Sequence, residues 1–288
     1  MDIFDLGWNL FRKALGNRLY ATLKKSPLGR PETYFALPTF KCIFDRYCSN
    51  GFDFTGKHIL EVGGGRQFYT AGLFLSAGAK EVTLVDPVFA QPGIENDTLI
   101  REHFNSLQVT CPTGFSFEND RIQCYPSLDS LVATSPRQFD FIGSHFSLEH
   151  FRDLDNFFSS AASLLSSGGT TINFVDLSDH AYHLFNSRVL TRKLYLQRQL
   201  YHLRYSDALY NAITDPRIWV NRALLPTYRE LARRHRFSIH HLSTTTCPPT
   251  IIHPDVIRKN KVIHVADLYV THFTLQLVRN STFRNFSK

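Results

Sequence analysis

The stretch His58-Ile-Leu-Glu-Val-Gly-Gly-Gly65 decides the fold. Its first five residues are predicted to form a short buried strand, which the three glycines follow directly. A helix is predicted next, at roughly 67–76, and closes at Gly78. A second apolar strand follows at residues 81–85. Strand, glycine turn, helix and strand within about thirty residues form a βαβ unit, so a parallel sheet covered by helices is expected.

The same alternation continues along the chain. Further strands are expected at residues 122–125, 139–143 and 170–175, with a helix at 153–166 before the last of them. Residues 180–215 are then predicted to form long helices that cap the site. Beyond them come a helix at 226–234, a strand at 237–242 and a long strand at 265–278. The apolar phase of this last strand shifts between Val270 and Phe273, which predicts a bulge.

Charge is unevenly distributed over the 288 residues, whose net charge is +7. No acid occurs between Asp5 and Glu32 or in residues 188–204, while both stretches are rich in Lys and Arg. Such stretches indicate either an anionic partner or solvated helix faces. Residues 3–23 have an amphipathic helical pattern, so this helix either packs on its own domain or lies in a membrane interface.

Other bulk features exclude several classes of protein. No apolar run is long enough to span a bilayer, and the N-terminus lacks the pattern of a signal peptide. The five cysteines are scattered without a C-x-x-C pair, so neither a disulfide framework nor a zinc site is predicted. A cytoplasmic protein, peripheral to the membrane at most, is the expectation.

Two carboxylates flank the glycine turn in the predicted sheet. Glu61 precedes the turn, and Asp86 ends the next strand. A dinucleotide fingerprint, G-x-G-x-x-G, would need glycine where Phe68 stands, and Glu61 would repel a pyrophosphate. Glu61 is instead suited to the ammonium of an amino acid, and Asp86 to ribose hydroxyls. S-adenosylmethionine, an amino acid that carries a nucleoside, satisfies both.

Four motifs in order resemble those of class I S-adenosylmethionine-dependent methyltransferases. They are Ile59-Leu-Glu-Val-Gly-Gly-Gly65, Leu84-Val-Asp-Pro87, the run from Phe139 to His150, and Ser167-Gly-Gly169 with the helix before it. This resemblance implies S-adenosylmethionine as cofactor, held by Glu61, Gly63, Gly64, Gly65, Asp86, Pro87, Ser144 and His145. Gln67 replaces a glycine that is frequent in the family, and Pro126-Ser127 stands where an adenine-binding acid is usual, with Asp129 nearby.

The resemblance also fixes the expected architecture. It implies an α/β fold of the Rossmann-like, doubly wound kind, with a mostly parallel seven-stranded sheet and an antiparallel last strand. We expect a helical N-terminal extension at residues 1–50 and a cofactor-binding core at 51–180. A helical cap insertion at 181–221 and the C-terminal part of the core at 222–288 complete the expected division.

Catalysis by such a protein depends mainly on positioning, because the methyl donor is already activated. A hydroxyl acceptor needs a base, and His145, His150, Asp176, Asp179 and His180 are the candidates. We favour His180 with Asp179, because the run after the fifth strand faces the expected acceptor side. A structural histidine near a helix start is the alternative for His180. No metal site is predicted.

A second, weaker resemblance concerns the acceptor. Asp176-Leu-Ser-Asp-His180, Trp219 and Asn221-Arg222 are similar to segments of methyltransferases of glycan and surface-polymer synthesis. It implies a small-molecule, glycan or lipid-linked acceptor, and Arg188 and Arg192 would meet its anionic groups. We favour methyl transfer to oxygen, with nitrogen and carbon as the alternatives that the sequence leaves open. A methyltransferase-like protein that only binds, and an NAD(P)-dependent oxidoreductase, are the alternatives. Nucleic-acid methylation is disfavoured, since Ser144-His-Phe-Ser147 replaces the N-P-P-Y tetrad of base-methylating enzymes.

Overall fold

The computed structural model describes residues 10, 14, 37–65, 68–91, 121–135, 137–180, 199–248, 252, 254–259 and 264–280. The predicted helix at 3–23 lies outside this part of the chain except for Leu10 and Ala14. Arg188 and Arg192 also lie outside it. The division of the chain at residues 50, 180 and 221 stays a prediction.

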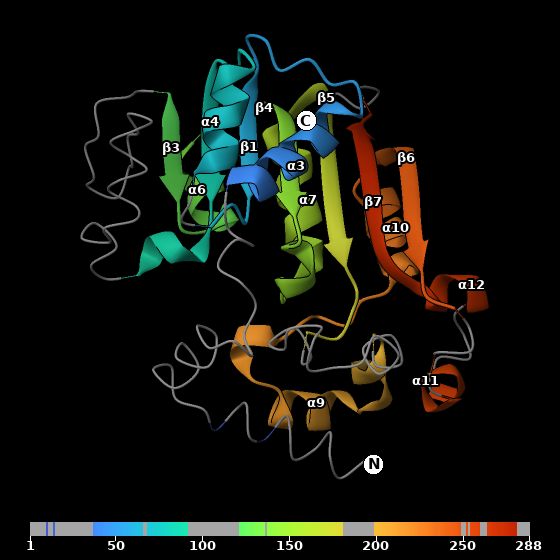
Figure 1. The fold of residues 1–288 in the computed structure, drawn as a ribbon. Coiled ribbons are helices and arrows are strands. Elements are labelled where there is room, and N and C mark those ends of the chain that lie inside the picture. Colours follow the sequence, from blue (N-terminus) through green and yellow to red (C-terminus); the bar gives the residue numbers. More distant parts are fainter. Residues whose placement is uncertain are drawn as a thin grey trace, which may run out of the picture.

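Seven strands form one mixed sheet in the order β3-β2-β1-β4-β5-β7-β6 (Figure 1). The strands are β1 (His58–Val62), β2 (Glu81–Val85), β3 (Ile122–Tyr125), β4 (Phe139–His145), β5 (Leu165–Asp176), β6 (Phe237–Thr246) and β7 (Val270–Arg279). The first five pair in parallel, and β7 is antiparallel to both β5 and β6. This confirms the predicted seven-stranded, Rossmann-like α/β fold with an antiparallel last strand.

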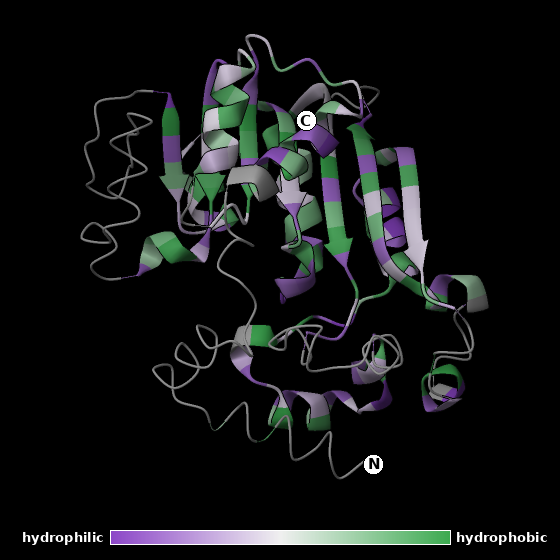
Figure 2. Ribbon diagram, viewed as in Figure 1, coloured by the Kyte–Doolittle hydropathy of each residue, from purple (hydrophilic) through white to green (hydrophobic). Residues whose placement is uncertain are grey.

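Successive strand residues point to opposite sides of the sheet. Both sets are apolar here, so helices cover the sheet on both faces. One face packs against α3 (Leu37–Cys48) and α4 (Tyr69–Ser76), and its core contains Ile59, Tyr47 and Phe74. The other face packs against α6 (Leu128–Thr134), α7 (Leu154–Leu164) and α10 (Leu225–Arg234), and its core contains Leu60 and Phe158. Figure 2 shows the edge strand β6 mostly white and purple, as its exposed side chains require.

A second layer lies beyond the carboxyl ends of the parallel strands (Figure 1). It contains the short helices η6 (Tyr201–Arg204), α9 (Asp207–Ile213), η7 (Pro216–Ile218) and α11 (Pro254–Lys259). An ion pair between Arg204 and Asp255 joins η6 to α11. The carboxyl edge of the sheet, where ligands bind in this class of fold, therefore faces this layer (Figure 1).

Two predictions about local structure are wrong within the described residues. Residues 199–215 form short helices instead of long ones, since Ser206 caps α9 and Pro216 follows closely after it. The last strand begins at Val270, and residues 265–268 form the helical turn α12 (Val265–Leu268), which His264 caps by accepting from the N–H of Ala266.

The bulge predicted between Val270 and Phe273 is present. The pairing of β7 with β6 passes from His272 directly to Val270, so Thr271 is the extra residue. None of the described helices combines the length and the apolar character that a bilayer crossing requires.

Candidate functional site

A cavity of about 440 Å³ opens at the carboxyl ends of β1 and β2. Its lining includes three residues predicted to bind the cofactor: Gly63, Asp86 and Pro87. Polar side chains from the α6 and α7 region complete it, with Ser127, Asp129, Asp153 and Asn156 in the lining. The volume falls in the range of small-molecule sites, roughly 300–1,000 Å³.

Gly63 lets the backbone turn sharply beneath this cavity. Its φ of +82° lies in the left-handed region, and a Cβ there would stand 2.4 Å from the Cβ of Ser147. Ser147 is fixed in turn, because its hydroxyl donates to the carbonyl of Val62 at 2.9 Å. Only glycine fits this position, because a side chain would clash with Ser147 and the left-handed conformation is strained for other residues.

Asp86 links the glycine turn to the second strand. One carboxylate oxygen accepts from the N–H of Gly65 at 2.9 Å, and the other accepts from the N–H of Val88 at 2.8 Å. Each carboxylate oxygen has two lone pairs, so these bonds leave acceptor capacity on the cavity side. Asp86 thus orders the turn and presents a fixed negative charge to a ligand.

Glu61 occupies a different environment from Asp86. Its side chain is only 4% exposed, and it lies under the turn, 3.1 Å from where a Cβ of Gly64 would stand. It is absent from the described lining of the cavity. Burial, reinforced by the charge of Asp86 and opposed by a hydrogen bond from Thr70, raises the pKa of Glu61 to about 8.

Ser144 and His145 lie apart from the cavity in the described structure. The hydroxyl of Ser144 is fully buried and donates to the side chain of Asn173 at 3.1 Å, so it belongs to the interior of the sheet. The ring of His145 packs against Phe146 and Phe174. Burial, with a smaller effect of the Arg46 charge, lowers the pKa of His145 to about 3. Their side chains therefore do not join Gly63 and Asp86 here.

The predicted catalytic residues follow β5. His180 is buried, and its Nε2 lies 3.5 Å from Asp176. The other carboxylate oxygen of Asp176 lies 3.2 Å from Nε2 of His272, which is on β7. Burial opposes the charge of Asp176, but the contacts with these two histidines outweigh it and hold its pKa well below the usual range. Asp179 is also buried, and its N–H donates to the carbonyl of Gln199 at 2.5 Å.

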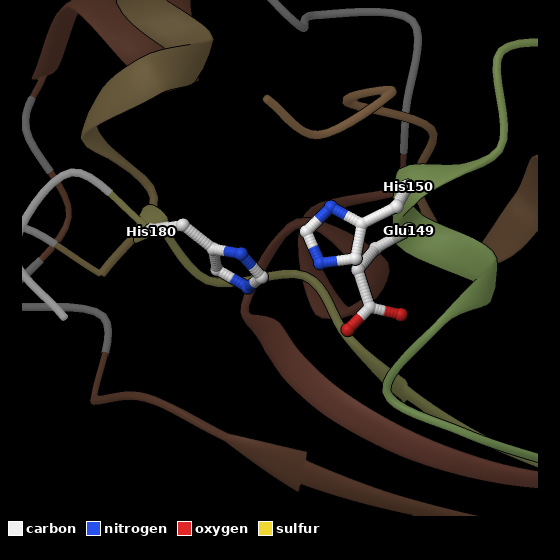
Figure 3. A group of neighbouring side chains, drawn as sticks. All are labelled: Glu149, His150 and His180. Carbon is white, nitrogen blue, oxygen red and sulfur yellow. The ribbon is translucent and has the colours of Figure 1, made fainter. Parts of the chain in front are cut away.

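His180 also meets two residues of the turn after β4. Glu149 and His150 lie on the helical turn η4 (Leu148–His150), and with His180 they surround a common point (Figure 3). The rings of His150 and His180 have centroids 5.0 Å apart. Burial raises the pKa of the Glu149 carboxyl well above its usual value. His150 is exposed and lines the 440 Å³ cavity, so this cluster borders the cofactor site.

A segment singled out in the sequence holds η4 in place. The side-chain amide of Asn221 donates to the carbonyls of Leu148 and Phe151 at 2.8 and 3.1 Å. Its backbone N–H donates to the carbonyl of Glu149 at 2.7 Å. The neighbouring Trp219 offers its carbonyl to Nδ1 of His150 at 2.7 Å. The capping layer therefore fixes the orientation of the Glu149–His150 turn.

A second cavity, of about 560 Å³, opens on the face of β5, β7 and β6 that lies beside α3. Phe146 lines both cavities. The described lining of the second one contains Arg46, His241 and His272, together with hydroxyl side chains, and no carboxylate. Its chemistry suits an anionic ligand.

Sequence reasoning missed several of these residues. Glu149 stood in a recognised motif but carried no expected role, and His272 lay in a strand with no chemical signal. Asp129 was noted only as a neighbour of the missing acid, yet it lines the cavity and accepts from the amide of Asn156 at 2.9 Å. The signal that could have found Glu149 is its adjacency to His150, a carboxylate and an imidazole on one turn.

Comparisons with known proteins support the fold described above. Two solved structures with TM-scores of 0.50 share the fold. An O-methyltransferase family protein from Burkholderia thailandensis is 12% identical, with 94% of this chain and 63% of that chain covered. Phosphoethanolamine N-methyltransferase 2 from Haemonchus contortus, solved with phosphomonomethylethanolamine and S-adenosylhomocysteine, is 14% identical, with 84% and 52% covered. No curated protein matches the chain by sequence.

The fold, with its cavity at the carboxyl ends of β1 and β2, is that of a Rossmann-like, doubly wound α/β protein. The methyltransferase domain family matches residues 43–216, and the chain belongs to this family. The predicted class I S-adenosylmethionine-dependent methyltransferase, with S-adenosylmethionine as its cofactor, is thereby confirmed. The oxidoreductase alternative is set aside.

Proposed function

We propose that this protein transfers a methyl group from S-adenosylmethionine to an oxygen atom of a small-molecule or glycan acceptor with anionic character. One observation carries the proposal: Gly63, Asp86 and Pro87, from two neighbouring strand ends, line a single cavity of about 440 Å³ in a chain of the methyltransferase family. Gly63 lines this cavity and carries no side chain, because a Cβ there would clash with Ser147, so a cofactor can approach the main chain closely at this point.

Different residues of the chain are proposed to contact different parts of the cofactor. Asp86 is placed to accept from ribose hydroxyls, while Asp129 and Asn156 offer polar contacts to a base at the far end of the cavity. Glu61, beneath the turn, is proposed to bind the ammonium group of the cofactor through its carboxylate. When bound, S-adenosylmethionine supplies a methyl group attached to a sulfonium sulfur. Once the acceptor takes the methyl group, the rest of the cofactor leaves as a neutral thioether.

The acceptor is proposed to enter from the side of the second cavity. Arg46, His241 and His272 give this cavity positive or hydrogen-bond-donating groups, which favour a phosphate or carboxylate on the acceptor. Phe146 stands between the two cavities and lines both. The proton of the acceptor hydroxyl has to leave during transfer. We propose His180 as the residue that accepts it, since its ring lies 5.0 Å from that of His150, which lines the cofactor cavity.

Calorimetry with S-adenosylhomocysteine tests the cofactor site. We expect Asp86→Asn to weaken binding by at least about tenfold, because hydrogen bonds to a charged group contribute roughly 1.5–3 kcal/mol. Asp140→Asn is the matched control, since Asp140 accepts from the N–H of His58 at the opposite end of β1. Equal binding by wild type and Asp86→Asn would show that Asp86 does not contribute to ligand binding.

Titration in buffers of different ionisation enthalpy tests Glu61. At pH 7 a carboxyl with a pKa of about 8 is mostly protonated. Glu61 has to ionise to bind the ammonium group, so about one proton is released per ligand bound. The variant Glu61→Gln should release none. A wild-type binding enthalpy that is independent of the buffer would show that no proton is released, and therefore that Glu61 does not bind the ammonium group.

Labelled methyl transfer to an extract of the source organism tests the acceptor. Label in a polar, anionic small molecule or glycan as a methyl ether or ester would support the proposal. Label in nucleic acid or on nitrogen would overturn the acceptor class, and cofactor binding without any transfer would favour a methyltransferase-like protein that only binds.

A further inference from the structure

We infer that Glu149, His150 and His180 form a binding site for one divalent transition-metal ion. Each of the three offers one ligand atom, and these atoms lie within 4.8 Å of one another. Figure 3 shows the two imidazole rings and the carboxylate directed toward a shared space, with His180 approaching from the segment after β5 and the other two from η4. Two imidazoles and a carboxylate on one side of an ion, with open positions opposite, are an established set of ligands for such ions.

The spacing requires only a small closure. Bonds of about 2.0–2.2 Å from a central ion place neighbouring ligand atoms roughly 3–3.5 Å apart. Rotation about the side-chain torsions of His150, which is exposed, and of His180 can supply the remaining distance. The backbone of η4 need not move, which matters because Asn221 donates to the carbonyl of Leu148, its first residue, and to that of Phe151, the residue after it.

Glu149 gives an independent reason to expect a cation. Its side chain is 1% exposed. Neither of its carboxylate oxygens has a hydrogen-bond partner of ordinary geometry in the part of the chain that the structure describes. A buried carboxylate without a partner is unfavourable by several kcal/mol unless a proton or a cation neutralises it. Here the two imidazoles beside Glu149 are further metal ligands, so a bound cation is the neutralising group that we infer.

The surroundings prepare both histidines for metal binding. The carbonyl of Trp219, 2.7 Å from Nδ1 of His150, can only accept, so the proton of His150 lies on Nδ1 and the lone pair lies on Nε2. Asp176 contacts His180 in the same manner as the outer carboxylate of a carboxylate–histidine–metal arrangement. The capping layer and β5 thus supply the outer contacts that orient metal-binding imidazoles.

The choice of ion follows from the donors. Imidazole nitrogen favours Zn²⁺ and the later transition ions, and carboxylate oxygen also accommodates Mn²⁺, whereas Ca²⁺ and Mg²⁺ prefer oxygen alone. Zn²⁺ and Co²⁺ are therefore suitable test ions. A catalytic use of the ion rests on the proposed function: His150 borders the cofactor cavity, and an ion there would lower the pKa of an acceptor hydroxyl that it contacts.

Binding of Zn²⁺ and Co²⁺ to the full chain, stripped of metal and without cofactor, tests the site. We expect one ion per chain by calorimetry, and visible absorption of the Co²⁺ form typical of nitrogen and oxygen ligands. His150→Ala and Glu149→Gln should each weaken Zn²⁺ binding by more than about 100-fold, since even outer-shell partners cost 10–100-fold when lost. The control His240→Ala removes an exposed imidazole from β6 and should leave binding unchanged.

Two results would overturn the inference. One is the absence of stoichiometric binding by the wild type for both ions. The other is binding that His150→Ala and Glu149→Gln leave intact, which would place the ion elsewhere. His150 is exposed, so its replacement should preserve the fold, as a melting curve would verify. Affinity for S-adenosylhomocysteine, measured on the same samples, reports separately on the proposed function.

Discussion

Replacing Glu61 by Gln should change how the stability of the protein depends on pH. Glu61 is buried, and folding raises its pKa from about 4.5 to about 8. Below pH 4.5 the carboxyl is protonated in both the folded and the unfolded chain, and above pH 8 it is ionised in both. Between these values the folded chain holds a proton that the unfolded chain has released, so wild-type stability falls as pH rises through this window.

The size of the effect follows from the same two pKa values. Each pH unit inside the window changes the free energy of unfolding by about 1.4 kcal/mol. From pH 5.5 to 7.5 the wild type should therefore lose roughly 3 kcal/mol relative to Glu61→Gln. The glutamine keeps the shape of the side chain and removes the titration, so all other ionisable groups cancel in the comparison.

Urea denaturation of both proteins at pH 5.5, 6.5 and 7.5, at one ionic strength, measures this difference. The free energies of unfolding should diverge with rising pH, with Glu61→Gln gaining relative to the wild type. Equal slopes of urea dependence in the two proteins would show that the native and unfolded states are otherwise unchanged. Parallel pH profiles would refute the reasoning, because they would mean that Glu61 is ionised in the folded chain throughout.

Three further substitutions test other parts of the site. Gly63→Ala should lower the free energy of unfolding by about 2–4 kcal/mol in a denaturation curve, because it adds left-handed strain and a clash with Ser147; an unchanged midpoint would contradict the turn geometry. Asn221→Ala should cost about 1–3 kcal/mol and also weaken Zn²⁺ binding, since η4 loses its anchor; a loss of stability alone would limit Asn221 to the fold. His180→Ala should slow methyl transfer more than it weakens S-adenosylhomocysteine binding, and an unchanged rate would exclude His180 from turnover.

The local pattern of the chain was enough to predict much of the architecture. The strands at 81–85 and 122–125 coincide with β2 and β3, because short apolar runs between turn residues have few other stable conformations. The last strand was predicted too long. Residues 265–268 are apolar enough for a strand, but the cap from His264 stabilises a helical turn, and periodicity carries no information about that hydrogen bond.

The site was less predictable than the fold. Gly63, Asp86 and Pro87 share a cavity because parallel strands end at one edge of the sheet, which the order of the motifs already implies. Ser144, from the following motif, pairs with Val62 directly beside the glycine turn, yet a contact with Asn173, twenty-nine residues away, draws its hydroxyl into the sheet. Which side of a strand end a polar side chain faces depends on such neighbours.

The sequence by itself determined the class of fold, the methyltransferase family and the carboxylates around the glycine turn. These depend on interactions between residues close in the chain, which spacing records directly. Only the tertiary structure decided that Glu61 is buried while Asp86 lines the cavity, and that His180 meets Glu149 and His150. Those arrangements depend on contacts between residues far apart in the chain, and they form only when the sheet and its capping layer have packed together.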